Sequence, residues 1–340
     1  MVRKFNVAVV GATGAVGEAM LSILAERRFP VGDVHAVASS RSAGQTVPFA
    51  DRELNVQDLD SFNFAGVDIG LFSPGAAVSS VYAPRAAAAG CIVVDNTSRF
   101  RFEADVPLVV PEVNAHAIAQ FRNRGIIANP NCSTIQMVVA LKPIYDAVGI
   151  ERINVCTYQS VSGTGKDAIA ELERQTVALL NGRAIECNVF PKQIAFNVLP
   201  HIDEFMDNGY TREEMKIIWE TRKILGDDGI LVNPTAVRVP VFYGHSEAIH
   251  IETREKIGAA EVHTLLQGRA GIVVLDERRD GGYPTAVTEA TGRDPVYVGR
   301  IRDDLSHPRG INLWVVSDNV RKGAALNSVQ IAEILVKDYL

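Results

Sequence analysis

The chain opens on a short apolar segment that runs directly into glycines. Residues 5–10, FNVAVV, are mostly apolar and rich in valine, which is typical of a buried parallel strand. Three glycines follow as G-x-x-G-x-x-G from Gly11 to Gly17, and apolar residues from Met20 to Leu24 recur at helical spacing. A strand, a glycine turn and a helix form the phosphate-binding start of a Rossmann unit. Such a turn can also serve packing alone, but its place after a strand near the N-terminus favours a dinucleotide.

The apolar pattern continues as an alternation of strands and helices. It predicts strands at 68–72 and 91–95 with an alanine-rich helix at 78–89 between them, as in a doubly wound parallel sheet. Later strand-like stretches are separated by helices, which indicates a mixed α+β domain; they are residues 153–158, 237–242, 248–252 and 311–316. A last helix carries an apolar stripe on Ala325, Leu326, Val329, Ala332, Leu335 and Val336.

The end of the second strand bears on the choice of cofactor. A NAD enzyme usually carries Asp or Glu there for the ribose 2′-hydroxyl, whereas this chain follows the strand at 35–38 with Ser39-Ser40-Arg41-Ser42. A carboxylate would repel a 2′-phosphate, but hydroxyls and a guanidinium can bind one. The segment therefore favours NADP, with a solvated arginine in a polar loop as the alternative.

One cysteine lies where a helix is expected to begin. A short strand at 125–128 is followed by Asn129-Pro130-Asn131-Cys132-Ser133-Thr134 and then by an apolar helix at 135–141. Pro130 favours an extended turn, which places Cys132 near the helix N-terminus, where the dipole and free amides stabilise a thiolate. We interpret Cys132 as a nucleophile. The other cysteines have apolar or strand-like neighbours and are expected to be small buried packing residues: Cys91, Cys156 and Cys187.

A thiolate nucleophile needs a partner for proton transfer, and His245 is the best-placed of seven histidines. It ends the stretch 237–245, which predicts a strand leading into a glycine turn. Arg238 lies seven residues earlier, and an odd separation puts it on the opposite face of a strand unless Pro240 or Gly244 twists the chain. Periodicity alone does not bring Arg238 and His245 together.

Composition limits the class of protein. A length of 340 residues suggests two domains, and 47% hydrophobic with 22% charged residues is ordinary for a globular chain. The formal net charge of −6 offers no basic surplus for nucleic acid. No apolar run is long enough to span a membrane, and the N-terminus is too short in apolar residues for a secretory signal. Four cysteines without a C-x-x-C pair favour a reducing, cytoplasmic compartment, and we expect no metal site.

Several segments together resemble the bacterial aspartate-semialdehyde dehydrogenases. The motifs are GATGAVG at 11–17, NPNCST at 129–134, YQSVSG at 158–163, EEMK at 213–216, RVPV at 238–241 and GHS at 244–246. The first is shared by many dehydrogenases, whereas the others in this order are specific to the family. The resemblance implies NADPH-dependent reductive dephosphorylation of L-4-aspartyl phosphate to L-aspartate-4-semialdehyde through a thioacyl enzyme. That reaction serves the biosynthesis of lysine and diaminopimelate, methionine, threonine and isoleucine.

The resemblance also implies a role for each site residue. Cys132 would be the nucleophile and His245 the general acid and base. Gln159 would orient the substrate, Arg238 would pair with its α-carboxylate, and Glu213 would bind its amino group. The phosphate would be held by Arg99 and Lys216. The cofactor would contact Gly11, Thr13, Gly14, Ala15, Val16, Gly17, Arg41, Ser42, Ser162, Gly163 and Asn319.

Without the resemblance, some of these residues have a simpler interpretation. Glu213 and Lys216 are one helical turn apart, and a surface ion pair is the default for such a pair. Two other functions remain open. One is an N-acetyl-glutamyl-phosphate reductase, whose substrate has no free amino group for Glu213 to bind. The other is a catalytically inactive relative, which the presence of both Cys132 and His245 disfavours.

The expected fold is α/β, with a Rossmann-type NADP-binding domain and a mixed α+β catalytic and dimerisation domain. The resemblance implies that the last helix returns to the first domain, which gives residues 1–131 with 319–340 as the NADP-binding domain and 132–318 as the catalytic domain. The expected partners are the small-molecule substrate with phosphate and a second copy of the chain in a homodimer; nucleic acid and membrane are not expected.

Overall fold

The computed structural model describes residues 3–340, and the chain folds into two compact units. The first unit comprises Met1–Asn131 and Ala324–Leu340, and the second comprises Cys132–Gly323. The two units are described in turn.

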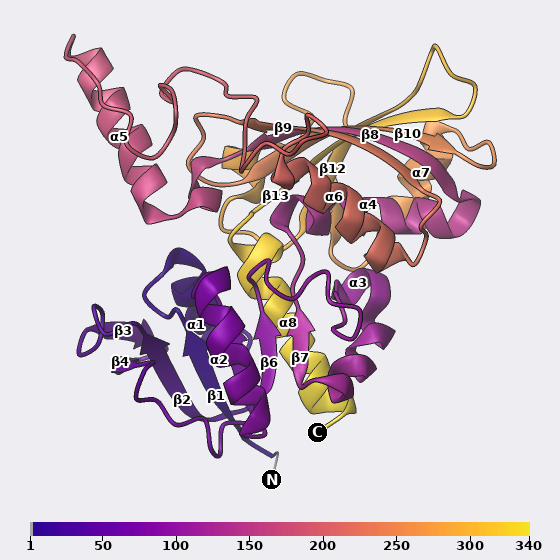
Figure 1. Cartoon of the computed structure of the whole chain (residues 1–340). Helices are drawn as coiled ribbons and strands as arrows, with labels where there is room; N and C mark the ends of the chain where they lie inside the picture. The colour runs from indigo at the N-terminus through magenta and orange to yellow at the C-terminus, as the bar shows by residue number, and fades with distance from the viewer. Residues whose placement is uncertain (1–2) are drawn as a thin grey trace. The chain divides into compact units, whose positions relative to one another are not determined.

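The first unit is built on one seven-stranded sheet (Figure 1). Its strand order is β3-β4-β2-β1-β5-β6-β7, and every pairing is parallel except that of β3 with β4. The strands are β1 (Phe5–Val10), β2 (Val31–Ala38), β3 (Thr46–Phe49), β4 (Arg52–Asp58), β5 (Ile69–Phe72), β6 (Ile92–Asp95) and β7 (Ile126–Ala128). The order reverses at β1, whose neighbours are β2 and β5, and ligands of doubly wound sheets bind at such a switch point.

Three longer helices pack on this sheet. They are α1 (Ala15–Glu26), α2 (Ala76–Ala88) and α8 (Leu326–Asp338), and a short α3 (Pro111–Asn114) leads into the 3₁₀ helix η1 (Ala115–Asn123). Helices α1 and α8 contact each other and share one hydrophobic cluster with the sheet, in which Leu21 and Leu335 are fully buried. The apolar stripe of α8, at the C-terminal end of the chain, thus packs in the core of the first unit.

The second unit contains a six-stranded mixed sheet with the order β11-β12-β13-β10-β8-β9. Its strands are β8 (Ile150–Gln159), β9 (Leu231–Arg238), β10 (His245–Thr253), β11 (Ile272–Val274), β12 (Val296–Asp303) and β13 (Gly310–Ser317). The pairs β8·β9 and β11·β12 are parallel and the others antiparallel. The two sheets and their helices confirm the predicted fold class of an α/β unit followed by a mixed α+β unit.

One face of this second sheet is covered by helices. They are α4 (Cys132–Val148), α6 (Arg212–Leu225) and α7 (Ala259–Leu266). Side chains of β8 alternate accordingly: Val155 and Thr157 are buried on the covered face, whereas Asn154 and Cys156 are half-buried on the other. Short turns of helix occur at η2 (Val161–Thr164), η3 (Ala286–Ala290) and η4 (Arg321–Ala325).

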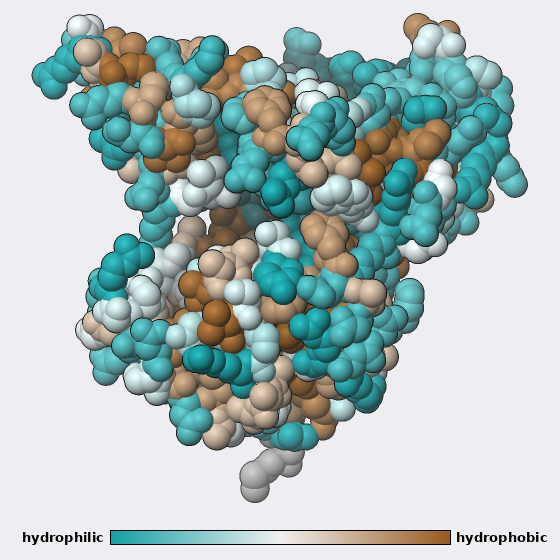
Figure 2. All heavy atoms as spheres, in the orientation of Figure 1, coloured by the Kyte–Doolittle hydropathy of each residue, from teal (hydrophilic) through white to brown (hydrophobic). Residues whose placement is uncertain are grey.

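Helix α5 (Lys166–Leu180) forms a separate small core with the loop that follows it. Hydrophobic residues gather on the surface over this helix and loop (Figure 2). The exposed apolar side chains there include Val177, Leu180, Phe196 and Val198. No helix within residues 3–340 is long and apolar enough to cross a membrane.

The strand expected at 237–242 lies earlier in the chain than predicted, at Leu231–Arg238. Strand β9 ends at Arg238 and β10 begins at His245, so the expectation of one continuous strand from 237 to the glycine turn is wrong. Pro240 lacks the N–H that a ladder needs, and Gly244 has a φ of +87° with a would-be Cβ only 2.8 Å from the Ala286 carbonyl oxygen. Arg238 and His245 therefore lie on different strands.

Candidate active site

Strand register in the second unit brings the predicted site residues into one row. Arg238 at the end of β9 pairs with Gln159 at the end of β8. Ser246 pairs with Tyr158, so the residue before it, His245, lies beside Gln159, and on its other side His245 pairs with Ser317 of β13. Arg238 and His245 therefore lie in the same row of the sheet, two strands apart, with Gln159 of β8 between them.

Cys132 is the first residue of α4, as predicted. It is half-buried, and it lies near enough to Arg238 for the two charges to interact. A helix N-terminus and a guanidinium both favour a thiolate. Gly323 also touches this residue, because a Cβ on Gly323 would lie 2.7 Å from the Cys132 Cβ. The sequence held no signal for that contact.

His245 is buried, and its ring is held from the Nδ1 side. The backbone N–H of Ser160 donates to Nδ1 at 3.1 Å, and the Ser160 hydroxyl lies 3.1 Å from the same atom. Burial, followed by the positive charge of Arg238, lowers the pKa of His245 to about 3. The ring is therefore neutral at pH 7, and because Nδ1 accepts a hydrogen bond, the proton is on Nε2.

Asn319 joins the loops around this histidine. Its Oδ1 accepts from the Ser160 hydroxyl at 3.0 Å, from the Ser162 hydroxyl at 3.2 Å and from the Gly244 N–H at 2.9 Å. Ser160 lies inside the YQSVSG motif, but its chemistry as a serine did not single it out from the sequence. Gly163, the last residue of that motif, would place a Cβ 3.2 Å from Arg238 and 3.4 Å from the His245 ring.

Gln159 links α4, the helix that begins at Cys132, to α6. Its amide nitrogen donates to the Ser133 hydroxyl and, at 3.2 Å, to the Glu213 carboxylate. A carboxylate can only accept hydrogen bonds, so the atom of the Gln159 amide that faces Glu213 must be the nitrogen and not the oxygen. Both amide hydrogens are used, so the Gln159 oxygen is the atom left for a ligand.

Glu213 and Lys216 form an ion pair at 3.1 Å, but it is not on the surface. Their side chains are 9% and 13% exposed, and Lys216 also contacts Asp203 at 2.7 Å. Burial alone would lower the pKa of Lys216, but the two carboxylates outweigh it and the net shift is upward. The surface pair expected from spacing alone is wrong, because the start of α6 packs beside the ends of β8 and β9.

Arg238 is a buried cation without an ion pair among residues 3–340. Its Nη1 donates to the Ser160 carbonyl at 2.6 Å, and its side chain is almost inaccessible to solvent. Burial lowers its pKa, and the nearby Glu213 and Cys132 oppose that shift. A guanidinium that keeps a full charge in such a place is suited to binding an anion that enters the site.

The three glycines of the first motif, which lie in the first unit, differ in whether the surrounding structure leaves room for a side chain. Gly11 has a φ of +87°, and a Cβ there would meet the Ser73 carbonyl oxygen at 2.7 Å. A Cβ on Gly17 would lie 2.2 Å from the Gly11 oxygen. Gly14 is the N-cap of α1 and would contact only the Gly11 oxygen, at 3.4 Å. The outer glycines are needed for packing, and the middle one leaves the helix N-terminus open to a phosphate.

The other predicted cofactor residues of this unit surround the same turn. Ala15 and Val16 form the first turn of α1. Thr13 contacts Ser42, with 3.4 Å between their hydroxyl oxygens, so the glycine turn lies beside the loop that follows β2. Arg41 in that loop is exposed and forms no ion pair within residues 3–340.

Arg99, a predicted phosphate residue, also belongs to the first unit. Its side chain is 41% exposed and pairs with Glu103 at 2.7 Å. Its guanidinium lies over the Phe100 ring, 5.0 Å from the ring centroid. The loop that carries it starts at Asp95, a buried carboxylate that accepts from the Ser79 and Thr97 hydroxyls at 2.7 Å each.

The other three cysteines have different surroundings. Burial raises the pKa of the Cys91 thiol to about 12, which suits a packing residue. Cys156 is half-buried on the open face of the second sheet, and Cys187 is exposed. The expectation that Cys187 is buried is wrong, because it lies in an irregular segment after α5 rather than in a strand.

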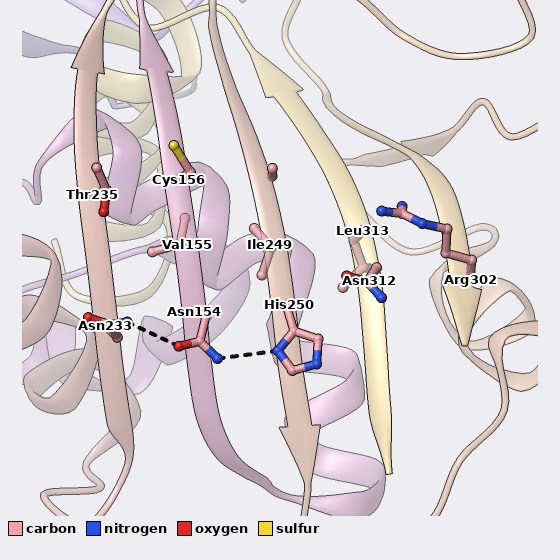
Figure 3. Close-up of a pocket in the computed structure, with 11 residues that line it drawn as sticks. Asn154, Val155, Cys156, Asn233, Thr235, Ile249, His250, Arg302, Asn312 and Leu313 are labelled. Carbon is pink, nitrogen blue, oxygen red and sulfur yellow. Dashed lines mark hydrogen bonds between the residues drawn. The ribbon is translucent and has the colours of Figure 1, made fainter. Parts of the chain in front are cut away.

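Cys156 and His250 line a hollow of about 290 Å³ on that open face (Figure 3). Hydrogen bonds of 3.2 Å run from Asn233 to Asn154 and from Asn154 to His250, and His250 also contacts Asp304 at 2.7 Å. The thiol points away from the imidazole in Figure 3. These residues therefore form a structural polar row and not a second nucleophile with its base.

Comparison with known proteins shows which family the chain belongs to. Residues 6–121 match the family described as semialdehyde dehydrogenase, NAD binding domain, and residues 141–322 match semialdehyde dehydrogenase, dimerisation domain. An aspartate-semialdehyde dehydrogenase of Shewanella violacea is 64% identical over 339 residues, which is 100% of each chain. The chain belongs to the aspartate-semialdehyde dehydrogenase family. It is therefore an oxidoreductase with a nicotinamide-nucleotide-binding domain, and its dimerisation domain supports the expected homodimer.

Two solved members of the aspartate-semialdehyde dehydrogenase family extend the comparison. The Vibrio cholerae enzyme II, solved in complex with ASA, has a TM-score of 0.98 and 61% identity and covers 99% of this chain and 100% of its own. A Candida albicans member, solved with NADP, has a TM-score of 0.75 and 28% identity, with 98% of each chain covered. The fold is thus kept where most of the sequence has changed.

Proposed function

We propose that this chain reduces L-4-aspartyl phosphate to L-aspartate-4-semialdehyde with NADPH, releasing phosphate, as expected from its motifs. The observation that carries the proposal is the buried, unpaired guanidinium of Arg238 beside Cys132 and His245. A small substrate whose carboxylate is separated from its reacting carbon by only two carbon atoms can satisfy that cation and reach the thiol at the same time. The fit of the Vibrio cholerae member, solved with ASA, supports this choice.

In this proposal the Cys132 thiolate attacks the acyl phosphate carbon. A carbon–sulfur bond forms, the carbon–oxygen bond to phosphate breaks, and the leaving phosphate takes the electron pair. Lys216 and Arg99 would hold that phosphate, and Glu213 the substrate amino group. Gln159, whose oxygen is the atom left for a ligand, would orient the substrate at the resulting thioester. NADPH, when bound, supplies the hydride that reduces the thioester carbon. The carbon–sulfur bond then breaks, which releases the aldehyde and returns the electron pair to the Cys132 sulfur.

The charge state of His245 gives it a defined task in the proposal. Its Nε2–H can donate to the oxygen of the reacting carbon, because Ser160 occupies Nδ1. The positive charge of Arg238 helps to keep the ring neutral. When a substrate carboxylate neutralises Arg238, that effect is removed and the pKa of His245 rises, which favours proton exchange during the reaction. To take a further proton, the ring must give up the hydrogen bond that Nδ1 accepts from Ser160.

The cofactor proposal rests on the residues of the first unit. Gly14, at the open N-terminus of α1, would bind the pyrophosphate together with Thr13, Ala15 and Val16, where Gly11 and Gly17 allow close backbone approach. Arg41 and Ser42 would bind the 2′-phosphate of NADP, and no carboxylate stands in that segment to repel it. The NADP in the Candida albicans relative supports the choice.

The cofactor residues of the second unit follow from the same network. Ser162, Gly163 and Asn319 would contact the nicotinamide end, and the hydrogen bonds of Asn319 would hold these loops in place. Cysteines without disulfides within residues 3–340 support a reducing, cytoplasmic location.

The test is a phosphate-dependent assay in the reverse direction. Purified protein with aspartate semialdehyde, phosphate and NADP⁺ should produce NADPH, followed by its absorbance, and omission of phosphate should stop the reaction. N-acetyl-glutamate semialdehyde in place of the first substrate tests the reductase alternative. No NADPH with aspartate semialdehyde would reject the proposal, and no NADPH with either aldehyde would favour the inactive relative.

A further inference from the structure

A buried carboxyl group lies next to the catalytic row and has no task in the proposed reaction. Glu247 is on β10, two residues after His245, and its side chain is fully buried on the same helix-covered face. It pairs with Thr157 of β8 and Val315 of β13. No arginine, lysine or histidine within residues 3–340 forms an ion pair with it, and neither carboxyl oxygen has a hydrogen-bond partner there.

Near Glu247 lie other polar atoms that have no hydrogen-bond partner among the described residues. They are both amide atoms of Gln136, the hydroxyl of Thr157 and the hydroxyl of Ser317, all buried. Gln136 lies close enough to Glu247 to affect its pKa, although the two do not reach hydrogen-bond geometry. Ser317 pairs with His245, and Thr157 faces Glu247 across the ladder. Buried polar atoms are almost always satisfied, so a cluster of four such side chains indicates a site for buried water.

The cluster lies between the two elements that carry the reacting groups. Gln136 is on α4 one turn after Cys132, and α4 packs on β8, β10 and β13. Glu247 is on the strand that begins with His245. Water placed between Gln136 and Glu247 would therefore connect the helix that begins at Cys132 to the strand that begins at His245.

Burial without a cation disfavours the carboxylate form of Glu247. Desolvation raises its pKa well above the ordinary value, and the effect of Gln136 is smaller and opposite. Of the titratable groups on the strands and helix that carry this cluster, His245 lies two residues from Glu247 on the same face of β10, and Cys132 lies one turn before Gln136 on α4. The neighbouring titratable side chains of β8 and β10 are on the opposite face of the sheet, and those further along α4 lie more than one turn beyond Gln136: Cys156, Tyr158, His250, Glu252, Lys142, Tyr145 and Asp146. A proton on Glu247 would provide a donor for water and avoid a second charge beside Cys132 and His245.

We propose that Glu247 is a positioning residue that acts as a neutral carboxylic acid and, through buried water shared with Gln136, Thr157 and Ser317, holds α4 against β10. This positioning role rests on the proposed function, because it concerns the geometry of Cys132 and His245. Glutamine at position 247 keeps the shape and the neutral hydrogen-bonding groups, whereas leucine removes them.

Steady-state kinetics over a range of pH test this role with three variants. Glu247→Gln should keep kcat, KM and the limbs of the kcat–pH profile, with kcat within twofold of the wild type. Glu247→Leu should lower kcat tenfold or more while KM changes less than threefold. Ile249→Val, on the same face two residues further along β10, is the matched control and should lower thermal stability without changing kcat.

Two results would overturn the inference. One is a shift of half a pH unit or more in a limb of the Glu247→Gln profile, which means that Glu247 is ionised and acts on His245 by charge. The other is an unchanged kcat in Glu247→Leu, which means that the cluster does not position the site.

Infrared difference spectra of wild type against Glu247→Gln give a readout that needs neither activity nor the leucine variant. The carbonyl band of a buried protonated acid should be present in the wild type and lost in the variant, and its absence rejects the neutral acid. An inactive wild type with a normal band would instead count against the proposed function alone.

Discussion

The contact between Gly323 and Cys132 leads to a prediction about a residue that carries no chemistry. In Gly323→Ala the new methyl carbon would lie 2.7 Å from the Cys132 Cβ and 3.2 Å from its Cα. Carbon atoms in proteins pack at about 3.5–4.0 Å. Either the start of α4 or the turn at η4 must therefore move by roughly 1 Å.

A displacement of that size at a nucleophile has a known order of cost. A misplacement of about 1 Å can lower the rate about 100-fold, since attack depends on near-contact distance and angle. We expect kcat of Gly323→Ala to fall about 100-fold. Overpacking should also cost roughly 1–3 kcal/mol of the free energy of unfolding. NADP binding should fall much less than kcat, because the glycine turn that we assign to the pyrophosphate is in the first unit and the new Cβ would lie at an ordinary contact distance, 3.7 Å, from the Cβ of Asn319.

The measurements are the phosphate-dependent NADPH assay, NADP binding by fluorescence titration, and the rate at which Cys132 is alkylated by iodoacetamide. Gly258→Ala is the matched control, because Gly258 is in the second unit, has a negative φ, and its new Cβ would meet other atoms at 3.5 and 3.9 Å. Activity of Gly323→Ala within threefold of Gly258→Ala would refute the reasoning, as would an equal loss in both variants.

Three further predictions concern the nucleophile, the histidine and the cofactor. Cys132→Ala should abolish NADPH formation while NADP still binds, and substantial residual turnover would mean that another group is the nucleophile. The pKa of an unfolded histidine is about 6.5 and that of the folded His245 about 3, so between these values only the unfolded chain gains this proton. As the pH falls from 6.5 toward 4, the wild type should therefore lose up to about 1.4 kcal/mol of unfolding free energy per pH unit relative to His245→Asn, as measured by urea unfolding. Parallel curves for the two proteins would contradict the neutral histidine. Arg41→Ala should raise KM for NADP⁺ about tenfold and leave KM for NAD⁺ unchanged, whereas equal effects on both cofactors would show that Arg41 does not contact the 2′-phosphate.

The local features of this chain were predictable from its sequence. A valine-rich strand before glycines predicts the strand–turn–helix at β1 and α1, and both formed there. A proline turn before an apolar helix places Cys132 at a helix N-terminus, because the signals that start a helix lie within a few residues of it. The motifs also indicated the family, which the comparisons confirm.

The neighbours of these residues were decided by tertiary structure. Periodicity could not bring Arg238 and His245 together, because they end and begin different strands, and the register of β8 with both strands places them on either side of Gln159. Ser160 holds the His245 ring through its backbone N–H, a group that every residue but proline carries.

The burial of charged side chains was likewise decided by tertiary structure and not by the local sequence. Spacing alone predicted a surface pair for Glu213 and Lys216, and packing at the start of α6 buried it. From the sequence, Glu247 is an ordinary polar residue of a strand. Only the helices over its face shield it from bulk solvent, and no cation within residues 3–340 pairs with it. The sequence by itself determined most of the elements and indicated the residues that we propose to react, since both depend on residues close along the chain. Tertiary structure alone decided their charge states and orientation, since those depend on what packs against them from distant segments.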